Sequence, residues 1–324
     1  MVQDVYNPLM CATTLIQFPE KRHEHATGFF YNYGGETYLV TNRHVLEHEN
    51  KQPEQISIRF RGHSDIGSTT REEVALYDSK FPRWLIHPFY PEADIAVIPL
   101  DQKLSHINDG EYLTGSLALS SDCFAGPNLL IRGGTGARVF GYPDGYVDKS
   151  SQFPIARNGM IASPYGNWFD GDPQFLVDGV MGQGMSGSPV YTERTNNFEK
   201  VHGRSHIAGP STFLIGIHSG EFRDTREARE SDLNLNQVWY SELIEGLLMY
   251  NGLCKYVDTV SLDLDSDMIQ SEISESDLSE FITKFSTWEL FDPERNQRTS
   301  PVESLDEKPG EEDLLSLITL LERE

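Results

Sequence analysis

Residues 182–190 read GQGMSGSPV, so Ser186 lies between glycines on a tight loop directly before a predicted strand. A nucleophile is expected at such a place. A hydroxyl is a weak nucleophile at neutral pH, so Ser186 needs a base that takes its proton and a further group that orients this base. The sequence offers a candidate for each, and both lie upstream.

The candidate base is His44, because an apolar run, Tyr38–Val40, leads directly into the polar residues Thr41–His44. The candidate orienting group is Asp94, an acid at the start of the apolar run Ile95–Leu100. Each residue alone also fits an ordinary loop or turn, and the glycines and serines of residues 182–188 alone fit a linker. The chain order His, Asp, Ser is that of chymotrypsin-type proteases and differs from the orders in subtilisins and α/β-hydrolases.

Three segments, Thr41–Leu46, Asp94–Leu100 and Gly184–Val190, resemble the signature blocks of trypsin-like serine peptidases. They are most similar to the disulfide-free bacterial branch that includes the high-temperature-requirement proteases and the glutamyl endopeptidases. The blocks are about 50 and then about 90 residues apart, which is the usual layout of the family. The resemblance covers roughly residues 10–250. It implies an all-β, chymotrypsin-like fold of two six-stranded β-barrels with a C-terminal helix, followed here by an acidic tail.

The resemblance also implies a serine endopeptidase that works through an acyl-enzyme. In that reading His44 is the general base, Asp94 orients it, and the backbone N–H groups of Gly184 and Ser186 form the oxyanion hole. Met185 stands where zymogen-type members carry an Asp that pairs with a newly cut N-terminus. Activation by N-terminal cleavage is therefore not expected.

Specificity is less clear from the sequence. Val180 stands where members with basic specificity carry an acid, so the resemblance implies no anchor for Lys or Arg. His218 matches the pocket histidine of glutamyl endopeptidases, which favours Glu or Gln side chains, whereas Met181 and Glu221 depart from that pattern. The alternative is a buried strand histidine bonded to backbone. The candidate substrate-binding residues are Val180, Met181, His218, Ser219, Gly220 and Glu221.

Short apolar runs separated by Gly, Pro and Asn indicate an all-β domain. Gly34-Gly35 predicts a hairpin turn between two strands. Further strands are expected at Ile56–Phe60, Trp84–His87, Ile95–Leu100, Ala137–Gly141, Gln174–Val177, Pro189–Thr192 and Phe213–His218. Helical spacing of apolar residues predicts a helix over Gln237–Leu248.

The composition changes near residue 258, which predicts a peptidase domain over residues 1–257. Its two barrels are expected at about residues 10–110 and 111–250. Residues 258–324 hold 19 acidic and 5 basic residues and predict a partly disordered tail. A short amphipathic helix is expected near 311–323, as a dock for a regulatory protein or as part of the core.

The net charge of −24 argues against nucleic-acid or anionic-membrane partners, so the expected partner is a protein or peptide substrate. The sequence has no membrane-spanning run and no secretory signal at its start, so cytoplasmic residence is expected. Its three cysteines are too few for a disulfide framework, and no motif predicts a metal or cofactor. The rival function is an inactive or latent protease-fold scaffold that binds proteins through the acidic tail.

Overall fold

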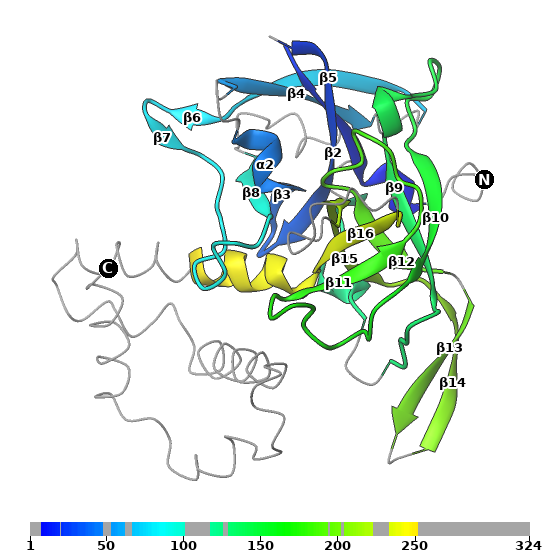
Figure 1. Ribbon diagram of the computed structural model, residues 1–324. Helices are drawn as coiled ribbons and strands as arrows, with labels where there is room; N and C mark the ends of the chain where they lie inside the picture. The colour runs from blue at the N-terminus through cyan, green and yellow to red at the C-terminus, as the bar shows by residue number, and fades with distance from the viewer. Residues whose placement is uncertain are drawn as a thin grey trace, which may run out of the picture. The chain divides into compact units, whose positions relative to one another are not determined.

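The computed structural model describes residues 8–19, 21–47, 53–61, 67–100, 117–125, 129–193, 195–201, 204–222 and 233–251. All of them belong to the first of two compact units, Met1–Leu262. The predicted acidic tail and its helix lie outside the described residues. The described part is mostly β and ends in a helix, as expected (Figure 1).

The first sheet has six antiparallel strands in the order β5-β4-β1-β2-β3-β8. Its outer strands do not pair with each other in the described part of the chain, so this sheet is a half-barrel. The strands are β1 Thr13–Phe18, β2 Lys21–Tyr33, β3 Glu36–Thr41, β4 Gln55–Arg61, β5 Thr69–Ala75 and β8 Ala96–Pro99. The short elements around both sheets are α1 Pro8–Cys11, α2 Arg43–Leu46, β6 Tyr77–Asp78, β7 Phe81–Pro82, η2 Ser121–Cys123 and η3 Pro143–Gly145.

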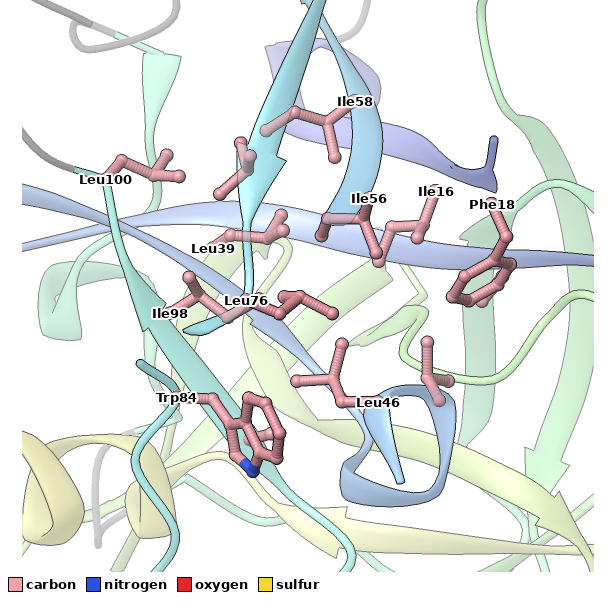
Figure 2. Close-up of a cluster of buried hydrophobic side chains, with 14 of the residues drawn as sticks. Ile16, Phe18, Leu39, Leu46, Ile56, Ile58, Leu76, Trp84, Ile98 and Leu100 are labelled. Carbon is pink, nitrogen blue, oxygen red and sulfur yellow. The ribbon is translucent and has the colours of Figure 1, made fainter. Parts of the chain in front are cut away.

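The core of the half-barrel anchors the short helix that carries His44. Ile56, Ile58 and Phe60 alternate along β4 and are fully buried, as expected for one face of a strand. Leu46 of α2 packs into the same cluster (Figure 2), and burying such a side chain contributes about 2 kcal/mol. Because α2 is only four residues long, this anchor also fixes the position of His44.

The second sheet closes into a barrel in the order β10-β11-β16-β15-β12-β9. Its strands are β9 Gly136–Gly141, β10 Ile155–Ile161, β11 Gln174–Asp178, β12 Pro189–Thr192, β15 Leu214–Glu221 and β16 Leu235–Tyr240. The interior is filled by buried apolar side chains, including Val139, Phe175, Val190 and Ile215. A separate hairpin, β13 Thr195–Val201 with β14 Arg204–Ser211, projects from the barrel (Figure 1).

The helix predicted to start at Gln237 begins later. Residues 237–240 belong to β16, and the helix occupies residues 242–251. The reason is tertiary, because β16 pairs with β11 on one side and β15 on the other and thereby closes the barrel. The strand predicted at Trp84–His87 is also reduced, to a single bridge between Leu85 and Val97.

Candidate active site

Strand pairing brings His44 and Asp94 together although 50 residues separate them. Strand β3 pairs with β8 so that Thr41 lies opposite Ala96. The chain leaves β3 through Asn42, whose amide donates to the backbone oxygen of Asp94 at 2.6 Å. The segments that carry the imidazole and the carboxylate are therefore joined directly.

The carboxylate of Asp94 accepts three hydrogen bonds. His44 Nδ1 lies 2.6 Å from Oδ2, the backbone N–H of His44 donates to Oδ1 at 2.9 Å, and Ser219 Oγ donates to Oδ2 at 2.5 Å. Burial raises the pKa of Asp94, but the hydrogen bonds and charge of His44 and the Ser219 hydroxyl outweigh it, so the pKa is lowered. An ionised carboxylate here keeps the proton of His44 on Nδ1 and leaves Nε2 as the acceptor.

Glycine is required in the loop that carries Ser186. Gly184 has a φ of +81°, in the left-handed region, and a Cβ built on it would lie 2.6 Å from the backbone oxygen of Tyr142. The preceding peptide is fixed as well, because Asp144 N–H donates to Gln183 O at 2.6 Å. The C=O and N–H of a trans peptide point in opposite directions, so the N–H of Gly184 points away from the backbone of Asp144.

Ser186 and His44 line the same pocket, together with Gly184. The Ser186 hydroxyl donates to the backbone oxygen of Ser219 at 2.9 Å. Among the described residues, no hydrogen bond joins Ser186 to His44. In structures without substrate, catalytic hydrogen bonds are often long or poorly aligned and tighten when substrate binds.

Thr27 of β2 is a supporting residue that the sequence did not reveal. Its hydroxyl donates to Gly184 O at 2.8 Å and accepts from Tyr142 N–H at 3.1 Å, while its N–H donates to Ser186 O at 2.9 Å. Its own carbonyl accepts from the Thr41 hydroxyl at 2.8 Å. Thr27 thus joins the half-barrel to the nucleophile loop. A threonine inside a strand is ordinary, so no local signal marks this role.

His218 is 2% exposed, and its ring lies between two acceptors. Nδ1 is 3.1 Å from Met185 O, and Nε2 is 3.0 Å from Asn236 Oδ1. Burial lowers the pKa of His218, partly offset by these two hydrogen bonds. The amide of Asn236 donates to three backbone oxygens, which fixes its Oδ1 toward the ring. His218 is therefore buried between one backbone oxygen and one side-chain amide oxygen, and its role in substrate binding stays a prediction.

The other candidate substrate-binding residues lie in different environments. Val180 is 62% exposed, whereas Met181 is buried in the barrel core. Ser219 contacts Asp94 and Ser186, Glu221 is exposed at the end of β15, and a Cβ on Gly220 would meet open space. None of them lines the pocket beside Ser186. No cluster of three or more potential metal ligands occurs among the described residues, and no helix found there is long and apolar enough to cross a membrane.

A family model for the trypsin-like peptidase domain matches residues 26–198, which is more than half of the chain and includes His44, Asp94 and Ser186. The chain belongs to the trypsin-like peptidase family. No curated protein sequence matches this trypsin-like peptidase.

Solved structures similar to this peptidase include bacterial serine proteases. A serine endoprotease from Yersinia pestis is 14% identical, with a TM-score of 0.44 over 74% of this chain and 62% of that chain. The HtrA-type protease AlgW with a tripeptide is 16% identical, with a TM-score of 0.41 over 78% and 60%. The thermostable protease AL20 from an extremophilic microorganism is 13% identical, with a TM-score of 0.42 over 74% and 97%. The matches span less than two thirds of the first two chains.

Proposed function

We propose that this protein is a serine endopeptidase that hydrolyses peptide bonds through Ser186, His44 and Asp94. The observation that carries the proposal is the contact between His44 Nδ1 and Asp94 Oδ2 at 2.6 Å, on an imidazole that lines the same pocket as Ser186. A partly buried carboxylate that holds an imidazole beside a glycine-flanked serine has the form of a nucleophile with its base and orienting group.

The chemistry follows from these positions. His44 Nε2 takes the proton of Ser186 as Oγ bonds to the peptide carbonyl carbon, whose π electrons move to the oxygen. The N–H groups of Gly184 and Ser186 are the proposed donors to this oxyanion. Collapse expels the amine, which takes the proton from His44, and leaves an acyl-enzyme. Water activated by His44 then releases the acid and restores Ser186. Asp94 stabilises the imidazolium during both steps.

The resting contact of Ser186 is compatible with this role. Its hydroxyl must leave the Ser219 carbonyl, a neutral hydrogen bond of 2.9 Å whose net contribution is about 1 kcal/mol. This cost is small compared with the binding energy of a peptide. The cost of releasing this hydrogen bond therefore does not oppose the proposed role of Ser186.

Activation independent of N-terminal cleavage is supported by Met185. Its side chain is fully buried in the core of the closed barrel. An apolar thioether at this place offers no charge to a newly formed N-terminal ammonium. We propose that the pocket forms without such a cut. A regulatory partner of the tail remains a prediction.

Labelling with a fluorophosphonate probe tests the proposed activity. The full chain is expected to label at Ser186, and Ser186→Ala should remove labelling and lower peptidase kcat by more than about 10⁴-fold. Ser188→Ala is the matched control, because Ser188 is in the same loop but buried, with its hydroxyl near Met185 Sδ. Labelling that persists in Ser186→Ala would contradict the proposed nucleophile. If neither the full chain nor the chain without residues 258–324 is labelled, the result would favour the alternative function, an inactive protease-fold scaffold.

A further inference from the structure

The pocket beside Ser186 has an apolar floor and an acidic rim. Its buried lining residues are Phe18, Ala26 and Val45, all from the half-barrel side of the site. Its exposed acidic residues are Glu24 of β2 and Asp144 of η3. The described lining includes no Lys or Arg. Two acidic residues therefore line the pocket from two separate elements.

The rim at Asp144 is held firmly by its backbone. Residues Pro143–Tyr146 form a tight turn in which Asp144 and Gly145 have φ values of +53° and +67°. Asp is one of the few residues besides Gly that adopt this conformation readily. The turn is tied to the nucleophile loop through Gln183, and the ring of His25 packs so closely on Gly145 that a Cβ there would lie 2.7 Å from Nε2. The backbone of Asp144 is thus fixed at the edge of the pocket that Ser186 also lines.

The pocket lies on the leaving-group side of Ser186. A bound peptide has an acyl half, which becomes the ester, and a leaving half, which departs as an amine. The leaving nitrogen must be reached by His44 Nε2, because Nδ1 is bound by Asp94. His44 lines the pocket, whereas Ser219, which contacts Ser186 Oγ, does not. The strand end at Ser219 therefore takes the acyl half, and the pocket takes the leaving half.

We propose that this pocket selects substrates with Lys or Arg within the first two residues after the scissile bond, and that Glu24 and Asp144 determine this preference. The proposal rests on the proposed peptidase function. The side chains of Lys and Arg each join an aliphatic stem to a cationic head. The stem covers the floor of Phe18, Ala26 and Val45, and the head reaches the carboxylates at the rim.

Charge sets the sign and the size of this preference. An acidic side chain in the pocket meets two like charges and is disfavoured. Because both rim carboxylates are exposed, each contributes as a surface ion pair does, about two- to fivefold in affinity. Salt weakens such pairs, since the screening length falls from about 8 Å at physiological ionic strength to about 3 Å at 1 M. The preference for a cation should therefore shrink at high salt.

Peptide binding to the full-length Ser186→Ala protein tests the proposal without turnover. The first pair of probes is Ala-Lys-Ala-Ala-amide and Ala-Nle-Ala-Ala-amide. In the second pair, one peptide begins with Lys-Ala and the other with Nle-Ala. Each peptide is titrated into the protein, and binding is followed by NMR. Norleucine keeps the aliphatic stem and removes the ammonium group. In at least one pair the Lys peptide is expected to bind about fivefold more tightly at low salt and less than twofold more tightly in 1 M NaCl.

Two charge-matched variants of that protein locate the effect. In Glu24→Gln/Asp144→Asn, the ratio of the affinities for the Lys and norleucine peptides should be close to one. Asn tolerates the left-handed backbone of position 144. Glu73→Gln/Asp78→Asn removes two exposed acids of β5 and β6 and should keep the ratio of the parent. Circular dichroism melting curves check that both variants fold.

The outcomes separate this proposal from the proposed function. Equal binding of Lys and norleucine peptides to the parent, an unchanged ratio in Glu24→Gln/Asp144→Asn, or no binding of any peptide would overturn the pocket assignment. If the ratios behave as expected but fluorophosphonate never labels Ser186, the peptidase proposal fails and the binding pocket stands.

Discussion

Thr27 shows how a single residue can support a catalytic loop without touching substrate. Its side-chain and backbone groups bind Gly184, Ser186, Tyr142 and Thr41. The hydroxyl bond to Gly184 O spans 157 residues of sequence. It fixes the carbonyl that follows one of the proposed oxyanion donors, so Thr27 is a positioning residue.

Thr27→Val should lower activity while the fold persists. Valine keeps the shape but leaves Gly184 O and Tyr142 N–H without their partner, at a cost of about 1–3 kcal/mol for each group that stays unsatisfied. We expect the rate of fluorophosphonate labelling to fall about 10- to 100-fold as the loop loses its fixed geometry. Thr27→Ser, which keeps the hydroxyl, should restore most of the rate. Equal loss in both variants would contradict this assignment, because Ser keeps the hydroxyl that Val removes.

Residues that form local motifs could be predicted from the sequence, and residues that act over long distances could not. His44, Asp94 and Ser186 each follow or precede an apolar run in a recognisable block, and the structure brings His44 and Asp94 into contact. Thr27 and Asn236 carry no such mark, because their role depends on partners far away in the sequence. The functional roles of all these residues stay predictions until they are tested.

At the scale of elements, the segment that leads to Asp94 is organised by a buried histidine. His87 is 3% exposed, and its Nδ1 accepts the backbone N–H groups of Phe89 and Tyr90 at 3.3 and 3.2 Å. Burial lowers the pKa of His87 to about 4. The imidazole therefore stays neutral at physiological pH and holds the turn that precedes Asp94.

Because the pKa of His87 is lowered in the folded chain, we expect the protein to lose stability in mild acid. The ordinary pKa of 6.5 applies to the unfolded chain and a value of about 4 to the folded chain, so between these values the unfolded chain binds more protons. Above pH 6.5 the buried His87 should not affect the unfolding free energy. By pH 4 it should lower the unfolding free energy by about 3 kcal/mol. Urea unfolding at several pH values measures this. His87→Asn should show a shallower decline between pH 6.5 and 4, and an identical slope would contradict the assignment.

A strand could be predicted from the sequence where its residues coincide with a single apolar run. Ala137–Gly141 and Pro189–Thr192 were expected as strands, and the structure has strands with nearly the same bounds. The apolar spacing of Gln237–Tyr240 predicts the start of a helix because it continues into the observed helix at residues 242–251. Pairing with two distant strands decided the outcome, and periodicity within one segment does not contain that information.

At the scale of the whole molecule, an open half-barrel and a closed barrel share the proposed site. The half-barrel supplies His44 and Asp94, and the loop before β12 of the closed barrel supplies Ser186. The hydrogen bonds of Thr27 to Gly184 and Ser186 hold these parts together. Family resemblance predicted the paired arrangement, but whether the first sheet closes depends on pairing between its edge strands β5 and β8, which neither segment reveals by itself.

The acidity of the chain makes its stability depend on salt. Residues 1–257 alone carry a net charge of −10, and like charges repel one another in a compact domain. Salt screens this repulsion. Raising NaCl from 0.05 to 1 M should therefore raise the Tm, and a gain of about 1–2 kcal/mol corresponds to about 2–8 °C for a domain of this size. An uncharged osmolyte at equal osmolality should raise the Tm less, because it does not screen charge. A Tm that is constant or falls with NaCl would mean that ion pairs outweigh repulsion in this chain.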